Sequence, residues 1–197
     1  QLLPEGNYGV RRGEIFLPYS GSSFSLGDQL INLELLTKDE YAKLLSKEDL
    51  KNILSRQENK VDFENVLLEK SPVDKVLRNA YKELLKSDTE EKKQLLEKIN
   101  IYSKENKEWI EPKVLYKIFT EKNGTKYFND WNSKERDLYN EKIVSVKERE
   151  KIIETLKTSG FREEFGFEEF KQFLAEDHLA KTRKMLNDKG MKLSGDM

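Results

Sequence analysis

Apolar residues recur with the period of a helix along most of the chain beyond residue 37, and polar residues fill the positions between them. The clearest helix is predicted over 72–86, where Ser71 can cap the first turn and Pro72 suits its first position. Its apolar positions form one continuous face: Val73, Val76, Leu77, Ala80, Tyr81, Leu84 and Leu85. The same period predicts further helices that begin near Thr89, run from Pro112 to Asn123, and span 146–158 and 167–189.

Two short helices are predicted between residues 37 and 54. Thr37 and Glu40 stand at capping-box spacing ahead of the first, and Ser46 and Asp49 have the same spacing ahead of the second. The apolar residues that they are expected to bury are Tyr41, Leu44 and Leu45 in the first helix, and Leu50, Ile53 and Leu54 in the second.

The two ends of the chain differ from this helical middle. Five of the ten glycines lie in the first 27 residues, which predicts a short strand at Leu2-Leu3, a long glycine-rich aromatic loop, and an apolar stretch from Leu30 to Leu36. At the other end, Gly190 stops the last helix and residues 191–193 alternate as a strand that leads to Gly195-Asp196. A helix followed by a strand is half of a β/α unit. Neither end looks like a frayed terminus, so we expect a piece of a longer protein.

Composition narrows the class of protein. Charged residues make up 37% and hydrophobic residues 36% of a chain whose net charge is −1, so a general nucleic-acid binder is disfavoured. The absence of cysteine excludes disulfides, zinc thiolate sites and a cysteine nucleophile. No apolar run is long enough to span a bilayer and no signal peptide opens the chain, so we expect a cytoplasmic protein with no membrane partner. The sequence leaves the oligomeric state open.

Few residues suggest chemistry. The acids are scattered over predicted helix surfaces, and His178 is the only histidine, for which a partly buried or surface helical position is favoured over a functional one. Serine-hydrolase, phosphate-loop and dinucleotide motifs are absent, and no cofactor or metal is expected. In the first loop, Tyr8, Phe16 and Tyr19 accompany serine hydroxyls, a combination that suits the apolar face and the hydroxyls of a sugar. Asp196, at the end of a predicted strand, is a candidate if that strand belongs to a barrel.

Several stretches, taken in order, resemble the 4-α-glucanotransferases (amylomaltases or disproportionating enzymes) of glycoside hydrolase family 77. The stretches that carry the resemblance are Gln1-Leu2-Leu3-Pro4, Pro18-Tyr19-Ser20, Ser22-Ser23-Phe24-Ser25-Leu26, Ile31-Asn32-Leu33, Val61-Asp62-Phe63, Arg78-Asn79-Ala80-Tyr81, Asn106 with Trp109, Gly124 with Trp131, Phe170 to Leu179, and Lys189 to Met197. The chain departs from the family pattern in its first loop, where Val10 to Leu17 separate Tyr8-Gly9 from Pro18-Tyr19 and Phe16-Leu17 stands in place of Asp-Ser. It departs again where Gly27-Asp28 replaces Asn-Pro and where His178 replaces a glutamine, while Ile31-Asn32-Leu33 follows as the family's Ile-Asp-Leu.

The resemblance implies an α/β fold, a partial (β/α)8 barrel with one or two early strands, dominated by a large, mostly α-helical insertion. It implies three parts: a barrel strand with the glycine-rich aromatic active-site loop over 1–36, a helical insertion subdomain over 37–165, and a barrel helix with the following strand over 166–197. The implied partner is a malto-oligosaccharide or α-glucan. The implied substrate-binding residues are Tyr19, which matches the tyrosine of a Ser-Pro-Tyr loop, Tyr8, and Asp196.

The implied reaction is transfer of α-1,4-glucan segments between malto-oligosaccharides with retention. A retaining enzyme uses two carboxylates about 5 Å apart. No residue here matches the family's nucleophile, acid/base or third acid, so this segment is expected to supply donor-site wall and helical insertion and to be inactive alone. The alternatives are a non-catalytic helical module derived from that family, which binds glucan or another protein, and a helical scaffold unrelated to glucans.

Overall fold

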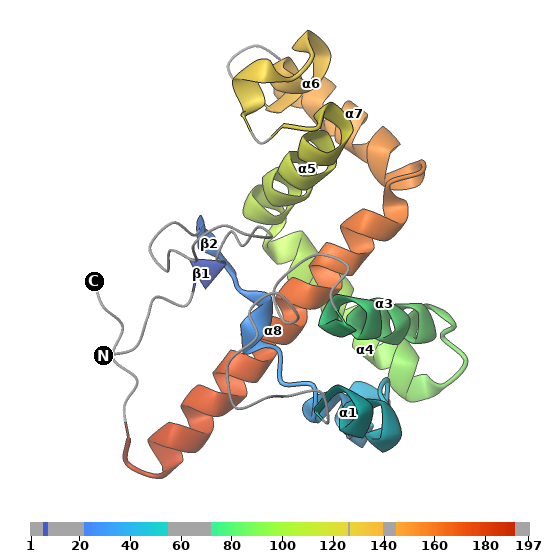
Figure 1. Cartoon of the computed structure of the whole chain (residues 1–197), viewed down its shortest axis with the longest axis vertical. Helices are drawn as coiled ribbons and strands as arrows, with labels where there is room; N and C mark the ends of the chain where they lie inside the picture. Colours follow the sequence, from blue (N-terminus) through green and yellow to red (C-terminus); the bar gives the residue numbers. More distant parts are fainter. Residues whose placement is uncertain (1–5, 8–21, 55–71, 126, 140–144, 192–197) are drawn as a thin grey trace. The chain divides into compact units, whose positions relative to one another are not determined.

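The computed structural model describes residues 6–7, 22–54, 72–125, 127–139 and 145–191. In chain order the elements are β1 (Gly6–Asn7), β2 (Ser22–Leu26), η1 (Asp28–Leu30), η2 (Leu35–Thr37), η3 (Asp39–Tyr41), α1 (Lys47–Leu54), α3 (Pro72–Leu85), α4 (Glu90–Glu105), α5 (Lys107–Asn123), η4 (Phe128–Asp130), α6 (Ser133–Tyr139), α7 (Val146–Thr158) and α8 (Arg162–Asp188) (Figure 1). The mainly helical character predicted from the apolar period is therefore confirmed.

The chain forms two compact units, which are described separately. The first contains residues 1–102 and 170–197, and the second contains Ser103–Glu169. The chain passes between them inside α4 and inside α8. The division predicted from the family resemblance, into 1–36, 37–165 and 166–197, stays a prediction.

The strands described by the structure are β1 and β2, which pair antiparallel with an irregular register between Gly6 and Asn7. The strand predicted at Leu2-Leu3 lies outside the described residues, as does the strand predicted after Gly190, apart from Met191. The predicted partial barrel likewise stays a prediction.

The short helix predicted from Thr37 is replaced by two 3-10 turns, η2 and η3. The Thr37 hydroxyl donates a hydrogen bond back to the Glu34 carbonyl (2.8 Å) and caps no helix. Ala42 and Lys43 follow with φ of 53° and 48°, a left-handed backbone that cannot continue a helix. Tyr41, Leu44 and Leu45 are buried as predicted. The helix predicted after Ser46 is confirmed as α1. Its predicted cap is present, since the Ser46 hydroxyl accepts a hydrogen bond from the Asp49 amide (3.0 Å).

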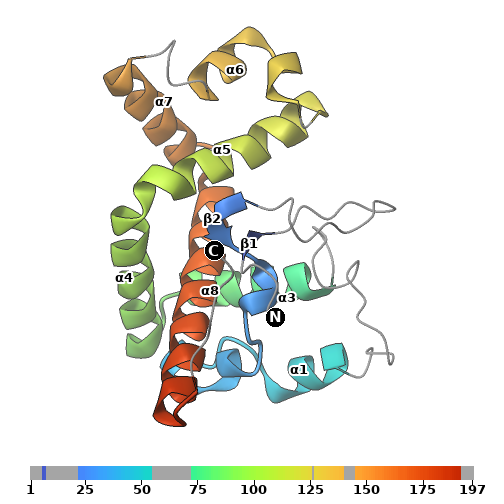
Figure 2. The same cartoon turned by 90° about the vertical axis from the view of Figure 1, so that its left-hand side faces the viewer.

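The first unit packs its apolar side chains around the C-terminal part of α8. The Tyr81 ring of α3 lies 5.5 Å from the Phe170 ring, and the Tyr102 ring of α4 lies 5.7 Å from the Phe173 ring. The residues that fill this core are Leu36, Tyr41, Leu77, Ala80, Leu84, Leu95, Ile99, Phe170, Leu174 and Ala175. Figures 1 and 2 both show the segment from β2 to η3 (blue) running beside α8. Leu85, placed on the buried face by its spacing, is instead exposed.

The second unit is built on α5, which begins five residues before the predicted start at Pro112. The Ile110 side chain is buried, and the Asn106 carbonyl accepts the Ile110 amide (3.1 Å), so the turn that starts the helix lies ahead of the proline. Gly124 ends the helix with φ of 66°, as predicted. The residues that fill this second core are Ile110, Val114, Leu115, Ile118, Phe119, Trp131, Leu138, Ile153, Phe165 and Phe167.

The last helix, α8, begins at Arg162, five residues before its predicted start, and Gly190 (φ 72°) follows its end as predicted. Gly166 lies inside it, and Phe165, the residue directly before this glycine, is buried. Among the helices that the structure describes, none is both long and apolar enough to span a bilayer.

Candidate functional site

The three residues predicted to bind substrate, Tyr8, Tyr19 and Asp196, lie outside the described residues. The structure does describe the chain on both sides of the predicted sugar-binding loop. Asn7, which precedes Tyr8, pairs with Ser22, where the described chain resumes after Tyr19. Residues 8–21 therefore leave from and return to one strand pair.

The end of that strand pair is held by Gln172, a fully buried residue of α8. The Gln172 side-chain oxygen accepts a hydrogen bond from the Leu26 amide (3.1 Å), and the side-chain nitrogen donates one to the Leu26 carbonyl (3.0 Å). One side chain thus satisfies both backbone groups of the last residue of β2, in the way that a neighbouring strand would. Sequence analysis did not single out Gln172. Its signal is a polar residue inside the apolar stripe of the last helix.

An ion pair fixes the next turn of chain to the same helix. The buried Lys171 ammonium lies 2.8 Å from the Asp28 carboxylate, and Asp28 opens η1. The second oxygen of Asp28 is buried without a hydrogen-bond partner among the described residues. Asp28, which stands where the resembling family has a proline, therefore forms a direct contact with α8.

His178 makes a third contact one to two turns further along α8. Its side chain is 2% exposed, and its Nδ1 atom accepts a hydrogen bond from the Asn32 backbone amide (2.9 Å). The ring proton consequently sits on Nε2, which is buried with no hydrogen-bond partner among the described residues. Burial lowers the pKa of His178 to about 4, although the neighbouring Asp177 carboxylate acts in the opposite direction. The imidazole is therefore neutral and serves as an acceptor.

A charged cluster completes this interface around Tyr41. The Tyr41 ring meets the His178 ring edge to face at 5.0 Å, and its hydroxyl donates a hydrogen bond to Asp177. The Lys181 ammonium lies 3.0 Å from Asp177, 3.1 Å from Glu40, and 4.3 Å from the centre of the Tyr41 ring. Burial, followed by the bond to Asp177, raises the pKa of the Tyr41 hydroxyl, so this proton is retained.

The chemistry of this interface is positional. Burial keeps the histidine neutral and the tyrosine protonated, so neither of these two groups is poised to exchange a proton with a substrate, and both carboxylates face the same ammonium group. The described residues also contain no group of three or more side chains arranged to hold a metal ion. What the interface does is fix residues 26–41, the chain that follows the predicted sugar-binding loop, along one helix.

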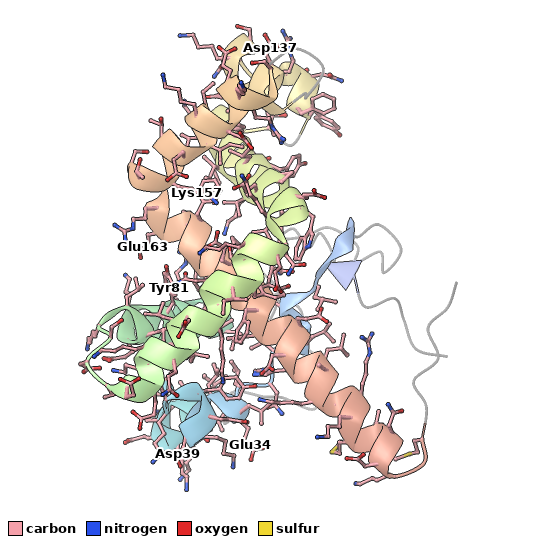
Figure 3. The ribbon with its side chains drawn as sticks, turned by 180° about the vertical axis from the view of Figure 1, so that it is seen from behind. Glu34, Asp39, Tyr81, Asp137, Lys157 and Glu163 are labelled. Carbon is pink, nitrogen blue, oxygen red and sulfur yellow. The ribbon has the colours of Figure 1, made fainter. Side chains whose placement is uncertain are left out.

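The second unit has its own set of buried acids, each paired with lysine. Glu168 lies 2.9 Å from Lys117 and 3.3 Å from Lys113, and Glu111 lies 2.7 Å from Lys157. Figure 3 labels Lys157, whose ammonium also faces the Phe165 ring at 5.4 Å. One acid and two lysines on α5 are thus matched by a lysine on α7 and by an acid near the start of α8, and we assign no chemistry to them.

Comparison with family models matches residues 1–197 to glycoside hydrolase family 77, described as 4-alpha-glucanotransferase. The comparisons with curated proteins and with solved structures gave no match.

Proposed function

The chain belongs to glycoside hydrolase family 77, the 4-alpha-glucanotransferases, as its motifs predicted, and we propose that it forms part of an enzyme that transfers α-1,4-glucan segments between malto-oligosaccharides with retention. The observation that carries this proposal is the family match over residues 1–197. In such a transfer, one carboxylate displaces the leaving sugar from the anomeric carbon while a carboxylic acid protonates the departing oxygen. A second sugar hydroxyl then takes the glucan from the enzyme in place of water.

Within that reaction we assign this chain to the wall of the donor site. Tyr8 and Tyr19 would stack on glucose rings and donate hydroxyl hydrogen bonds, and Asp196 would accept a hydrogen bond from a sugar hydroxyl at the end of a barrel strand. The contacts of α8 with Leu26, Asp28 and Asn32 support this role, because they hold the chain that directly follows the Tyr19 loop. A site that orients a sugar benefits from such a fixed base.

The architecture that we propose is the family's partial (β/α)8 barrel with a helical insertion. In this arrangement residues 1–36 and 166–197 belong to the barrel, and residues 37–165 form the insertion. We place the protein in the cytoplasm.

No residue of these 197 is assigned as nucleophile or acid/base, so the chain alone is expected to be inactive. The test is incubation of the purified chain with maltotriose, with products separated by chromatography. Disproportionation of two maltotriose molecules yields glucose and maltopentaose, and neither should form. Formation of both, in proportion to the purified protein and absent from a mock preparation, would contradict the assignment.

Sugar binding is tested by the intrinsic tyrosine and tryptophan fluorescence of the same chain during titration with maltose. We expect a saturable change in the wild type and in Tyr19→Phe, which keeps the ring, and its loss in Tyr19→Ala. A wild type that gives no response at millimolar maltose contradicts the donor-wall role and favours the alternative, a non-catalytic module that interacts with other proteins. A response identical in all three proteins places the sugar away from Tyr19.

A further inference from the structure

Three aromatic side chains of the second unit are exposed on α5 and on the turn that follows it. Tyr127 is 64% exposed, Phe128 is 38% exposed and Tyr116 is 37% exposed. Tyr127 and Phe128 lie on the turn between α5 and α6, the segment drawn in yellow in Figure 1, and Tyr116 lies on α5 itself. We call these three residues the aromatic patch.

Trp131 supports the patch from below. It is buried, its ring lies 5.5 Å from the ring of Tyr116 and 5.7 Å from that of Phe119, and its indole N–H donates to the Thr125 carbonyl (2.8 Å). Tyr116 therefore packs against Trp131, the residue that closes the turn containing Phe128.

The turn itself is closed by short-range hydrogen bonds. The Asp130 amide donates to the Tyr127 carbonyl (2.9 Å), and the Trp131 amide donates to the Phe128 carbonyl (3.3 Å). Directly after it, the Asn132 amide donates to the Asn123 side chain (3.0 Å), which ties the turn to the end of α5. A surface whose backbone is already ordered loses little conformational entropy when a ligand binds it.

Polar groups accompany the rings. Asn129 and Asp130, on the same 3-10 turn, are both exposed, and the two tyrosines add hydroxyls. Flat apolar surface beside donors and acceptors is what the apolar face and the equatorial hydroxyls of a glucose unit require. We propose that the aromatic patch is a second, non-catalytic binding surface for α-glucan, distinct from the loop that carries Tyr8 and Tyr19.

The charges near the patch favour a neutral ligand. The sequence from 121 to 137 carries four basic and four acidic residues, so this segment has no net positive charge for a phosphate or a nucleic acid, and Lys122 is paired with Glu135. The choice of α-glucan among neutral ligands rests on the function proposed above. The surface would hold a long glucan while one of its ends is processed elsewhere, which raises the local concentration of that end.

Native electrophoresis in gels containing soluble starch tests this surface. We compare the wild type with Tyr127→Ala/Phe128→Ala, with Tyr19→Ala, and with Ile101→Ala, a control that removes an equally exposed apolar side chain from the other unit. Starch should retard the wild type, and the double variant should bind at least about tenfold more weakly, since two stacking rings are lost. Tyr127→Phe/Phe128→Tyr, which keeps both rings, should restore retardation, and Ile101→Ala should not change it.

The variants separate this inference from the donor-site proposal. Retardation that survives in the double variant but is lost in Tyr19→Ala overturns the patch and supports the donor loop. Retardation lost in the double variant and intact in Tyr19→Ala supports the patch and counts against the donor loop. A wild type that runs unretarded, or one that is retarded equally by an α-1,6-linked dextran, overturns the patch as an α-glucan surface.

Discussion

Burial of His178 makes the stability of the protein depend on pH between about 4, the pKa of the folded state, and the ordinary histidine pKa of 6.5. The neutral ring accepts the Asn32 amide through Nδ1, so a proton on that atom would break the bond and place a charge in the core. The groups that face the ring are Asp177 and Glu40, which favour its charged form, and Lys181, which opposes it. Burial is the largest effect, and it lowers the pKa of His178 to about 4.

The sign of the effect follows from where the proton binds more tightly. The unfolded chain has an ordinary histidine pKa of 6.5, while the folded chain has a pKa of about 4, so between these values the unfolded state takes up the proton. Stability is complete above pH 6.5 and falls as the pH drops toward 4. Each tenfold preference for the neutral ring is worth about 1.4 kcal/mol, so the free energy of unfolding should fall by about 2 kcal/mol between pH 7 and pH 5 and by about 3 kcal/mol near pH 4.

The assay is urea unfolding at pH 7 and pH 5 for the wild type and for His178→Gln, whose side chain can accept the same amide but does not titrate. The difference between the two pH values should be about 2 kcal/mol larger in the wild type, because acids that titrate in this range contribute equally to both proteins. Since His178 is the only histidine, its imidazole signal can also be followed directly by NMR in the wild type. A measured pKa near 6.5, or equal pH dependence in the two proteins, would refute the account of a buried neutral acceptor.

Three further substitutions test other parts of the structure. Gln172→Ala should lower the free energy of unfolding by about 2 kcal/mol and speed amide hydrogen exchange at the end of β2, because two backbone groups lose their partner, whereas Gln94→Ala on the exposed face of α4 should change neither. Glu168→Gln should lower the free energy of unfolding in urea by about 2–3 kcal/mol, because Lys113 and Lys117 keep their charge, lose their ionised partner and are still partly hydrated. An unchanged urea midpoint would contradict a stabilising ion pair. Gly124→Ala should lower the free energy of unfolding by about 1 kcal/mol, because the backbone at residue 124 is left-handed while the added methyl group contacts no neighbour. Gly160→Ala also adds a methyl group without a contact, but its backbone is not left-handed, so its thermal unfolding should match that of the wild type.

The helices could be predicted from sequence where an apolar face repeats and a cap ends it. The 72–86 helix and the stop at Gly124 needed only the periodicity and one glycine. Two helix starts were predicted five residues too late, at Pro112 and at residue 167, because the apolar residues just ahead of them were not counted as buried. Burial of Phe165 is worth about 1.5–3 kcal/mol, which exceeds the cost of about 1 kcal/mol for Gly166 inside α8, and α5 starts early enough to bury Ile110 ahead of Pro112.

The contacts of α8 with Leu26, Asp28 and Asn32 could not be predicted, because they join residues more than 140 positions apart. Gln172 and Leu26 share no local pattern, and a glutamine on a helix is usually a surface residue. The short helix predicted from Thr37 failed for a related reason. Capping spacing is a local signal, and here burial of Tyr41 against α8 favours two tight turns over a regular helix.

The departures of this chain from the family pattern gain a common physical meaning at this interface. Asp28 and His178 are two of the residues that differ, and Asn32 takes the place of the acid in the family's Ile-Asp-Leu; the structure places all three where α8 meets the segment that follows β2, whereas the departure at Phe16-Leu17 lies outside the described residues. Asp28 forms a contact with Lys171 that a proline could not form. A carboxylate at position 32 would lie on the residue whose amide binds His178 and would favour the charged ring, whereas the neutral Asn32 leaves the ring neutral and able to accept. The three residues are therefore mutually compatible, and in this chain they attach the segment that follows β2 to α8.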